Sequence, residues 1–165
     1  MLRLGLWLLV GAAAVIGVAI GFGGASGQAL NSIGAIAWLT AAVVIGLALR
    51  NDGRAGATFA AATAAAIVLA VGIRPGELAA VIVAFGVAGV LVGSIAPSHP
   101  AGWAALVPGI YLPVHLAVAI SRPIIAGSTT LRTEPPPTAP LVPLAMVLAA
   151  AGAGYAIDRL RRRTE

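Results

Sequence analysis

Residues 4–22 read LGLWLLVGAAAVIGVAIGF, an apolar run without a charged side chain. An α-helix rises about 1.5 Å per residue and the hydrocarbon core of a bilayer is about 30 Å thick, so about 20 such residues cross it. The run is longer than the roughly 7–15 apolar residues of a secretory signal peptide. We therefore expect a transmembrane helix here. A cleaved signal peptide is the alternative, because small residues follow at 24–27.

Further apolar runs of similar length follow, separated by short polar or proline-containing stretches. Each run is uniformly apolar, whereas the strands of a membrane β-barrel alternate apolar and polar residues. The sequence therefore predicts an all-α polytopic transmembrane bundle of about six helices, forming a single domain over 1–165 with short loops and no soluble domain. The expected helices are approximately 4–22, 29–49, 55–73, 78–96, 101–120 and 139–157.

The composition of the whole chain agrees with a membrane location. Of its 165 residues 60% are hydrophobic and only 9% are charged, and the mean hydropathy is +1.03. Soluble domains carry about 25% charged residues, so this chain has too few charges to cover a surface that faces water. The net charge of +5 could indicate nucleic-acid binding, but the arginines flank the apolar runs and form no stripe with interleaved aromatic residues. We therefore expect the lipid bilayer as a partner and no nucleic acid.

Residue types that carry metal and cofactor chemistry are scarce. The chain has no cysteine, which excludes thiolate metal sites and iron–sulfur clusters. Its two histidines, His99 and His115, fall in different segments without the spacing of metal ligands. No phosphate-binding loop, dinucleotide fingerprint or paired-carboxylate motif occurs. The sequence predicts no metal, no cofactor and a protein that is not an enzyme.

The distribution of arginine predicts the orientation in the membrane. Basic residues near helix ends are retained on the cytoplasmic side, and more arginines lie on the inner side when the N-terminus is placed inside. We therefore expect the cell membrane, with both termini in the cytoplasm. A terminal cluster is expected to fix this topology and to contact anionic lipid, with a partner-docking tail as the alternative. It comprises Arg159, Arg161, Arg162 and Arg163.

Glycines at four-residue spacing predict close helix contacts. Gly17 and Gly21 form one such pair and Gly89 and Gly93 form another. Small residues let helix backbones approach in lipid, so we expect these pairs to pack helices within the chain, with homodimerisation as the alternative. The pairs also lie in similar stretches, VIGVAIG and VAGVLVG. An inverted repeat of two three-helix halves, as in many transporters, is therefore an open hypothesis.

The run at 101–120 contains the prolines and polar side chains that predict a functional site. Pro108 and Pro113 each remove a backbone hydrogen-bond donor, which leaves carbonyl groups in need of other partners. Tyr111 and His115 are four residues apart and share a helix face, and His115 is the one ionisable side chain deep inside a run. These features predict a proline-broken helix with a polar site that contacts a substrate or lines a cavity.

Two functions remain open from the sequence alone. Both a homo-oligomer and a heteromeric membrane complex are open as assemblies. The first function is a non-enzymatic accessory or structural subunit of a membrane assembly, which is expected to co-purify with a different chain. Small-residue helix faces and the absence of charged residues from the middle of the runs favour it. The second is a small transporter or channel that uses the polar site of the proline-containing helix.

Overall fold

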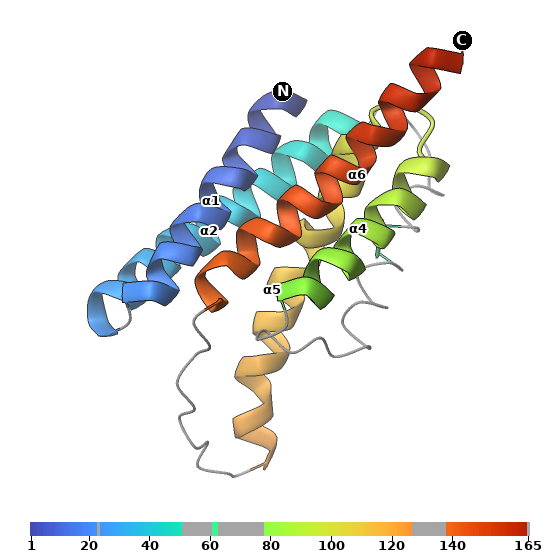
Figure 1. The fold of residues 1–165 in the computed structure, drawn as a ribbon. Coiled ribbons are helices and arrows are strands. Elements are labelled where there is room, and N and C mark those ends of the chain that lie inside the picture. Colours follow the sequence, from blue (N-terminus) through green and yellow to red (C-terminus); the bar gives the residue numbers. More distant parts are fainter. Residues whose placement is uncertain (23, 51–60, 63–77, 127–137, 165) are drawn as a thin grey trace.

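The computed structural model describes residues 1–22, 24–50, 61–62, 78–126 and 138–164, and every regular element among them is helical. Figure 1 shows the helices packed side by side in one bundle, which confirms the predicted all-α fold. The elements are α1 (Leu2–Phe22), α2 (Gly24–Leu49), α4 (Leu78–Ile95), α5 (Pro100–Ala126), the short 3-10 helix η2 (Ala139–Leu141) and α6 (Val142–Thr164).

Four described segments are long and apolar enough to cross a membrane: α1, α2, α4 and Ala139–Thr164. Their outer surfaces expose large hydrophobic side chains, among them Val18, Leu39 and Val83. Such extensive apolar surface is unfavourable in water but matches lipid. The chain is therefore a membrane protein. The predicted count of about six helices includes 55–73, which apart from 61–62 lies outside the described residues.

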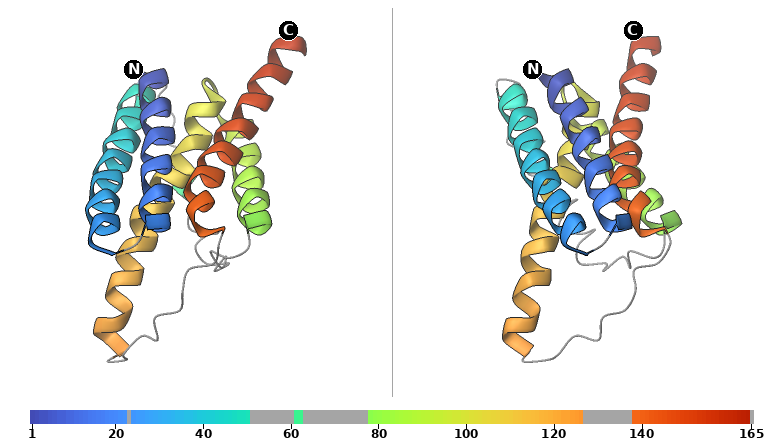
Figure 2. Two further views of the ribbon diagram at one scale, coloured as in Figure 1. Left: turned by 60° about the vertical axis from the view of Figure 1, so that its left-hand side comes forward. Right: turned by 90° about the vertical axis from the view of Figure 1, so that its left-hand side faces the viewer.

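The helices alternate in direction across the bundle. Figure 2 shows both chain termini at one end, which we call the terminal end. The helices α1 and α5 run away from the terminal end, and α2, α4 and α6 run toward it. Helix α6 packs against α4, α5 and α1, and α5 also contacts α2. Thus α5 and α6 join the α1–α2 pair to α4.

The connection between α1 and α2 is shorter than the sequence suggests. Its glycine and serine residues predict a turn over 23–28, whereas α2 begins at Gly24, which has a φ of +60°. This left-handed conformation costs glycine little and lets the chain reverse abruptly. Helix packing then favours small residues beyond the turn, since a methyl group added at Gly27 would lie 2.7 Å from the carbonyl oxygen of Ala19.

Two other helices extend beyond their predicted bounds. Helix α5 has 27 residues, which correspond to about 40 Å at 1.5 Å per residue. Figure 2 shows its C-terminal part passing beyond the ends of the neighbouring helices. Helix α6 continues past the expected end at residue 157 and carries the arginine cluster as its last turns. The cluster therefore has a fixed helical geometry.

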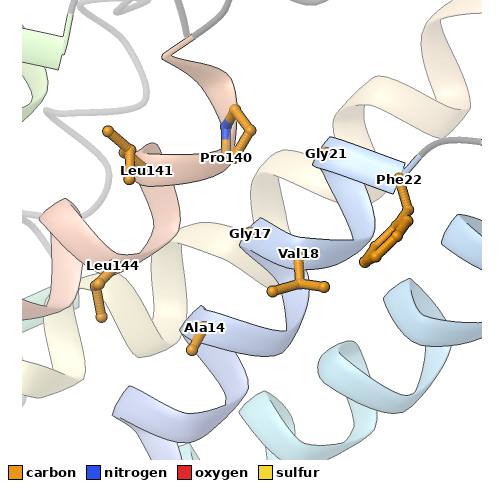
Figure 3. Close-up of a pocket in the computed structure, with 8 residues that line it drawn as sticks. All are labelled: Ala14, Gly17, Val18, Gly21, Phe22, Pro140, Leu141 and Leu144. Atoms are coloured by element: carbon orange, nitrogen blue, oxygen red, sulfur yellow. The ribbon is translucent and has the colours of Figure 1, made fainter.

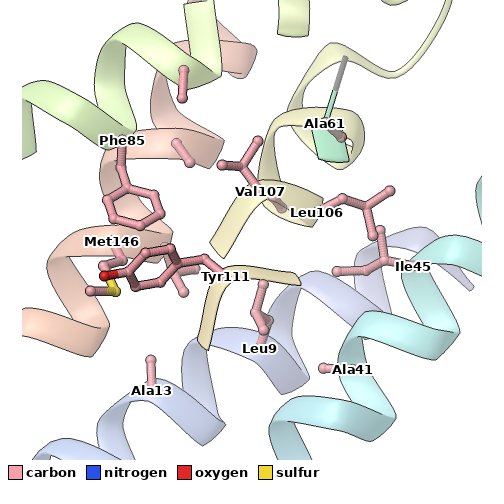
Figure 4. Packing of buried hydrophobic residues seen from close by; sticks show 14 of the residues in the cluster. Leu9, Ala13, Ala41, Ile45, Ala61, Phe85, Leu106, Val107, Tyr111 and Met146 are labelled. Atoms are coloured by element: carbon pink, nitrogen blue, oxygen red, sulfur yellow. The ribbon is translucent and has the colours of Figure 1, made fainter. Parts of the chain in front are cut away.

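The core lies where the helices meet (Figure 4). It is apolar throughout the described part of the chain, in which no polar or charged side chain other than tyrosine and tryptophan is fully buried. Every described helix contributes to it. Its largest fully buried side chains include Leu9, Trp38, Ile45, Phe85, Val107 and Val147.

Candidate functional site

The predicted polar pair on α5 is brought together. The ring centroids of Tyr111 and His115 are 5.4 Å apart with planes inclined by 17°, and the Tyr111 hydroxyl lies 3.5 Å from His115 Nδ1. Tyr111 is buried, and the ring of Phe85 from α4 meets it edge-on at 5.2 Å. Figure 4 shows the tyrosine inside the hydrophobic cluster. His115 is half-buried, so the pair leads from the core toward its edge.

The prolines do not break α5. The helix continues without interruption through Pro108, which is fully buried, and Pro113, which is half-buried. This corrects the expectation of a proline-broken helix. Within a bundle, packing by neighbouring helices offsets the loss of a backbone hydrogen bond, so proline is tolerated inside membrane helices. The polar site is consequently a pair of side chains on a continuous helix.

The predicted glycine pair of α4, Gly89 and Gly93, lies against α6. A methyl group added at Gly89 would come 2.5 Å from the carbonyl oxygen of Ala150, and one at Gly93 would come 3.2 Å from Cα of Gly154. Gly154 in turn lies against α5, where an added methyl group would be 2.6 Å from the carbonyl oxygen of Pro100. The backbones of α4, α6 and α5 therefore touch through glycine.

The predicted glycine pair of α1, Gly17 and Gly21, lies beside Pro140 of η2, and its two members have different surroundings. Gly17 is buried, and a methyl group there would collide with the carbonyl oxygen of Pro140. Gly21 is exposed and has room for one. Both border an open apolar groove of about 460 Å³, here named the α1/α6 groove (Figure 3). It is lined by Ala14, Gly17, Val18, Gly21, Phe22, Pro140, Leu141 and Leu144.

The four C-terminal arginines have different surroundings. The Arg161 side chain donates from Nη1 to the carbonyl oxygen of Ala96 at 2.6 Å and from Nη2 to that of Ser94 at 2.5 Å. Ser94 lies in the last turn of α4 and Ala96 directly follows Ile95, its last residue. No further helical turn supplies hydrogen-bond donors to these carbonyls, and the helix dipole favours a cation beside them. Arg162 pairs through Nε with Asp158 Oδ2 at 3.1 Å. Arg159 and Arg163 are exposed and make no hydrogen bond or ion pair within the described residues.

A second hollow lies at the terminal end, between the start of α5 and the end of α6. We call it the terminal-end pocket; its volume is about 290 Å³. The turn before α5 shapes it, because His99 adopts a φ of +51° and its carbonyl accepts hydrogen bonds from the backbone N–H groups of Gly102 and Trp103. The lining residues are Leu2, Ser98, His99, Pro100, Ala101, Gly102, Asp158 and Arg162.

Three features of these sites are not evident from sequence reasoning. Phe85 packs on Tyr111, Gly154 joins three helices, and Arg161 caps α4. The spacing of Gly154 behind Ala150 carries a small-residue signal, but nothing in it identifies the facing helix. The contact of Arg161 joins residues 65 positions apart, and no local pattern predicts it.

The described residues at these sites offer hydrogen bonding, apolar contact and attraction of anions. Among the described residues, no three histidine, aspartate or glutamate side chains lie close enough together to hold a metal ion. The Tyr111–His115 pair can exchange a hydrogen bond, and the arginines can hold anions. Comparison with known proteins identifies no family model, no characterised protein and no solved structure that matches this chain.

Proposed function

We propose that this chain is a non-enzymatic accessory or structural subunit of a membrane assembly. The observation that carries the proposal is the close packing of its described interior. Helix backbones touch at Gly89 and Gly154, and apolar side chains fill the space between α1, α2 and α5. A bundle packed in this way suits a protein that supplies a fixed surface to others.

The α1/α6 groove is the part of that surface most suited to a partner helix. Ala14 and Gly21 line it, and Gly21 is exposed to the surroundings with space for an added methyl group. In lipid, helices associate where small residues allow close approach. The proposed partner at the groove is therefore a transmembrane helix of a different chain.

The first experiment is extraction of the native complex in mild detergent, followed by measurement of its mass and composition. A defined complex with a different polypeptide supports the proposal, and a monomer or a homodimer contradicts it. The absence of cysteine allows a sharper second step with single cysteines. Leu141→Cys in the groove should cross-link to the partner, whereas Val83→Cys, which is also exposed on the outer surface but lies on α4, should not.

The proposal includes the cell membrane as location, with both termini in the cytoplasm. Exposed arginines gather at the terminal end on α1, after α2 and on α6, and basic residues favour the cytoplasmic side. A Thr164→Cys variant should resist a membrane-impermeant thiol reagent in intact cells and react after the membrane is opened. Reaction in intact cells would contradict this orientation.

The Tyr111–His115 pair supports a second candidate, a small transporter or channel. The stacked pair places an imidazole and a phenol on α5, whose C-terminal part extends past the neighbouring helices. Polar groups at membrane depth commonly lie on solute or proton pathways. The proposed role of His115 is to contact the transported solute or proton.

Vesicle uptake tests this candidate. His115→Phe should abolish most transport of an identified substrate, and Tyr111→Phe should reduce it less, because the ring and its contact with Phe85 remain. Unchanged uptake by the His115→Phe variant would contradict the transport candidate. The mass measurement on the native complex is unaffected by either result, so the two candidate functions are tested separately.

A further inference from the structure

The terminal end of the bundle is strongly basic. Arg3 lies in the first turn of α1, Arg50 follows α2, and the cluster on α6 lies at the same end of the bundle. The exposed members are Arg3, Arg50, Arg159, Arg162 and Arg163. Asp158 is the one acidic residue in the described part of the chain. A membrane protein with a basic end meets phospholipid headgroups there, and the charge favours anionic ones.

Within this basic end, Arg161 differs from the other arginines because its side chain bonds to backbone carbonyls at the end of α4. Its guanidinium is half-buried and bonded to the final carbonyls of α4, so it joins α6 to α4. Arg162, the next residue, points to another side and lines the terminal-end pocket. Its ion pair with Asp158 uses Nε, and its two terminal nitrogens make no hydrogen bond within the described residues. Arg162 is therefore the described arginine whose positive charge lines the terminal-end pocket.

The other walls of the terminal-end pocket also suit a phospholipid. The first turn of α5 forms one wall, and the start of a helix carries a partial positive charge. The Ser98 side chain adds a hydroxyl donor, and Leu2 supplies an apolar wall. Asp158 also lines the pocket, and its negative charge repels an anion. Removal of that charge should therefore strengthen the binding of an anion.

We propose that the terminal-end pocket binds the phosphate group of an anionic phospholipid, with Arg162 as its principal cation. The acyl chains then lie along the apolar outer surface of the bundle, which already faces lipid. This site does not depend on the assembly to which the protein belongs, because the bilayer supplies the ligand in either case.

The test is the dissociation constant for phosphatidylglycerol, measured by native mass spectrometry on the full-length protein in neutral detergent. Near a membrane surface one arginine contributes about fivefold in affinity for anionic lipid, so Arg162→Gln should weaken binding by about that factor. Arg163→Gln is the matched control, because it removes the same charge from an exposed neighbour outside the pocket lining. It should change binding less than twofold.

Asp158→Asn gives a result of the opposite sign and does not require the Arg162 variant to fold. It removes the negative charge from the pocket, so phosphatidylglycerol should bind severalfold more tightly. Equal losses in the two arginine variants, or no gain with Asp158→Asn, would overturn the proposal in favour of diffuse attraction. Equal binding of phosphatidylcholine would also overturn it, and displacement of the lipid by millimolar inorganic phosphate would assign the site to a free anion.

Discussion

The α1–α2 pair and the α4–α5–α6 group are both held together at glycine, but the glycines meet different partners. Away from their connecting turn, a methyl group added at Gly5 or Gly34 would lie nearest to an isoleucine Cγ1 atom across the α1–α2 contact, at 2.7 or 2.6 Å. The backbone nitrogens of the same isoleucines are farther away, at 3.2 and 3.3 Å. Gly89 and Gly154 face backbone atoms of the next helix. Away from the turn, the atom nearest to the glycine is thus a side-chain atom in the α1–α2 contact and a backbone atom in the α4–α5–α6 group.

The difference predicts how each region responds to added volume. A side chain can change rotamer or shift by a few tenths of an ångström, at a cost of about 1 kcal/mol. Backbone atoms within a helix move only if the whole helix moves. The α4–α5–α6 group should therefore be the rigid part of the molecule, and the α1–α2 contact the tolerant one.

The largest effect is expected for Gly154→Ala. The added methyl group would lie 2.6 Å from the carbonyl oxygen of Pro100 and 2.8 Å from Cα of Ala101, so α5 and α6 must separate. Overpacking of this kind costs about 3 kcal/mol at the upper end of its usual range. Titration with sodium dodecyl sulfate in mixed micelles measures the free energy of unfolding. A loss below about 1 kcal/mol would show that this contact can relax.

A smaller loss in the free energy of unfolding is expected for Arg161→Gln. Arg161 adds a polar contact between α4 and α6 to the backbone contacts at glycine. Two charge-assisted hydrogen bonds to the carbonyl oxygens of Ala96 and Ser94 disappear at a half-exposed site. We expect a loss of about 2 kcal/mol in the same titration. Arg161→Lys keeps the charge at the end of α4 and should recover part of it. Equal losses in both variants would contradict a role for charge in the cap.

The tolerant region is tested by Gly34→Ala. The new methyl group would come 2.6 Å from Ile16 Cγ1, a side-chain atom, and 3.3 Å from the Ile16 backbone nitrogen. The expected loss is about 1 kcal/mol. The double variant Gly34→Ala with Ile16→Ala should be more stable than the sum of the single losses predicts, because each change supplies the space or volume that the other needs. Strict additivity of the two losses would show that the space beside Gly34 does not host this side chain.

The sequence predicts the fold class because long apolar runs admit few structures in lipid. Glycine spacing identifies helix faces that allow close approach, yet it does not identify the facing element: Gly17 meets Pro140, and Gly89 meets Ala150. Proline illustrates a second limit. Pro108 disfavours an isolated helix, but it is buried in a continuous α5 because packing in the bundle outweighs the local preference.

Arg161 illustrates a third limit. Its position among four arginines predicts a surface role, whereas its side chain reaches a helix end that lies beside it only after folding. The pairing of Tyr111 with His115 was accessible to sequence reasoning because both residues lie on one helix. Contacts within a helix can thus be predicted here, and contacts between helices cannot.

The smallest effect is expected for Gly152→Ala, which separates helix propensity from packing. Gly152 lies on α6 only two residues before Gly154, but it is exposed and an added methyl group meets nothing within 4 Å. Alanine restricts the unfolded chain more than glycine and favours the helix, so the variant should gain about 0.5–1 kcal/mol in the same titration. Because the two positions share a helix, opposite signs for Gly152→Ala and Gly154→Ala would assign the cost at Gly154 to its contact with α5. A loss at Gly152 comparable to that at Gly154 would instead mean that α6 resists added volume on every side, and the contrast between the two regions would no longer rest on the backbone contacts.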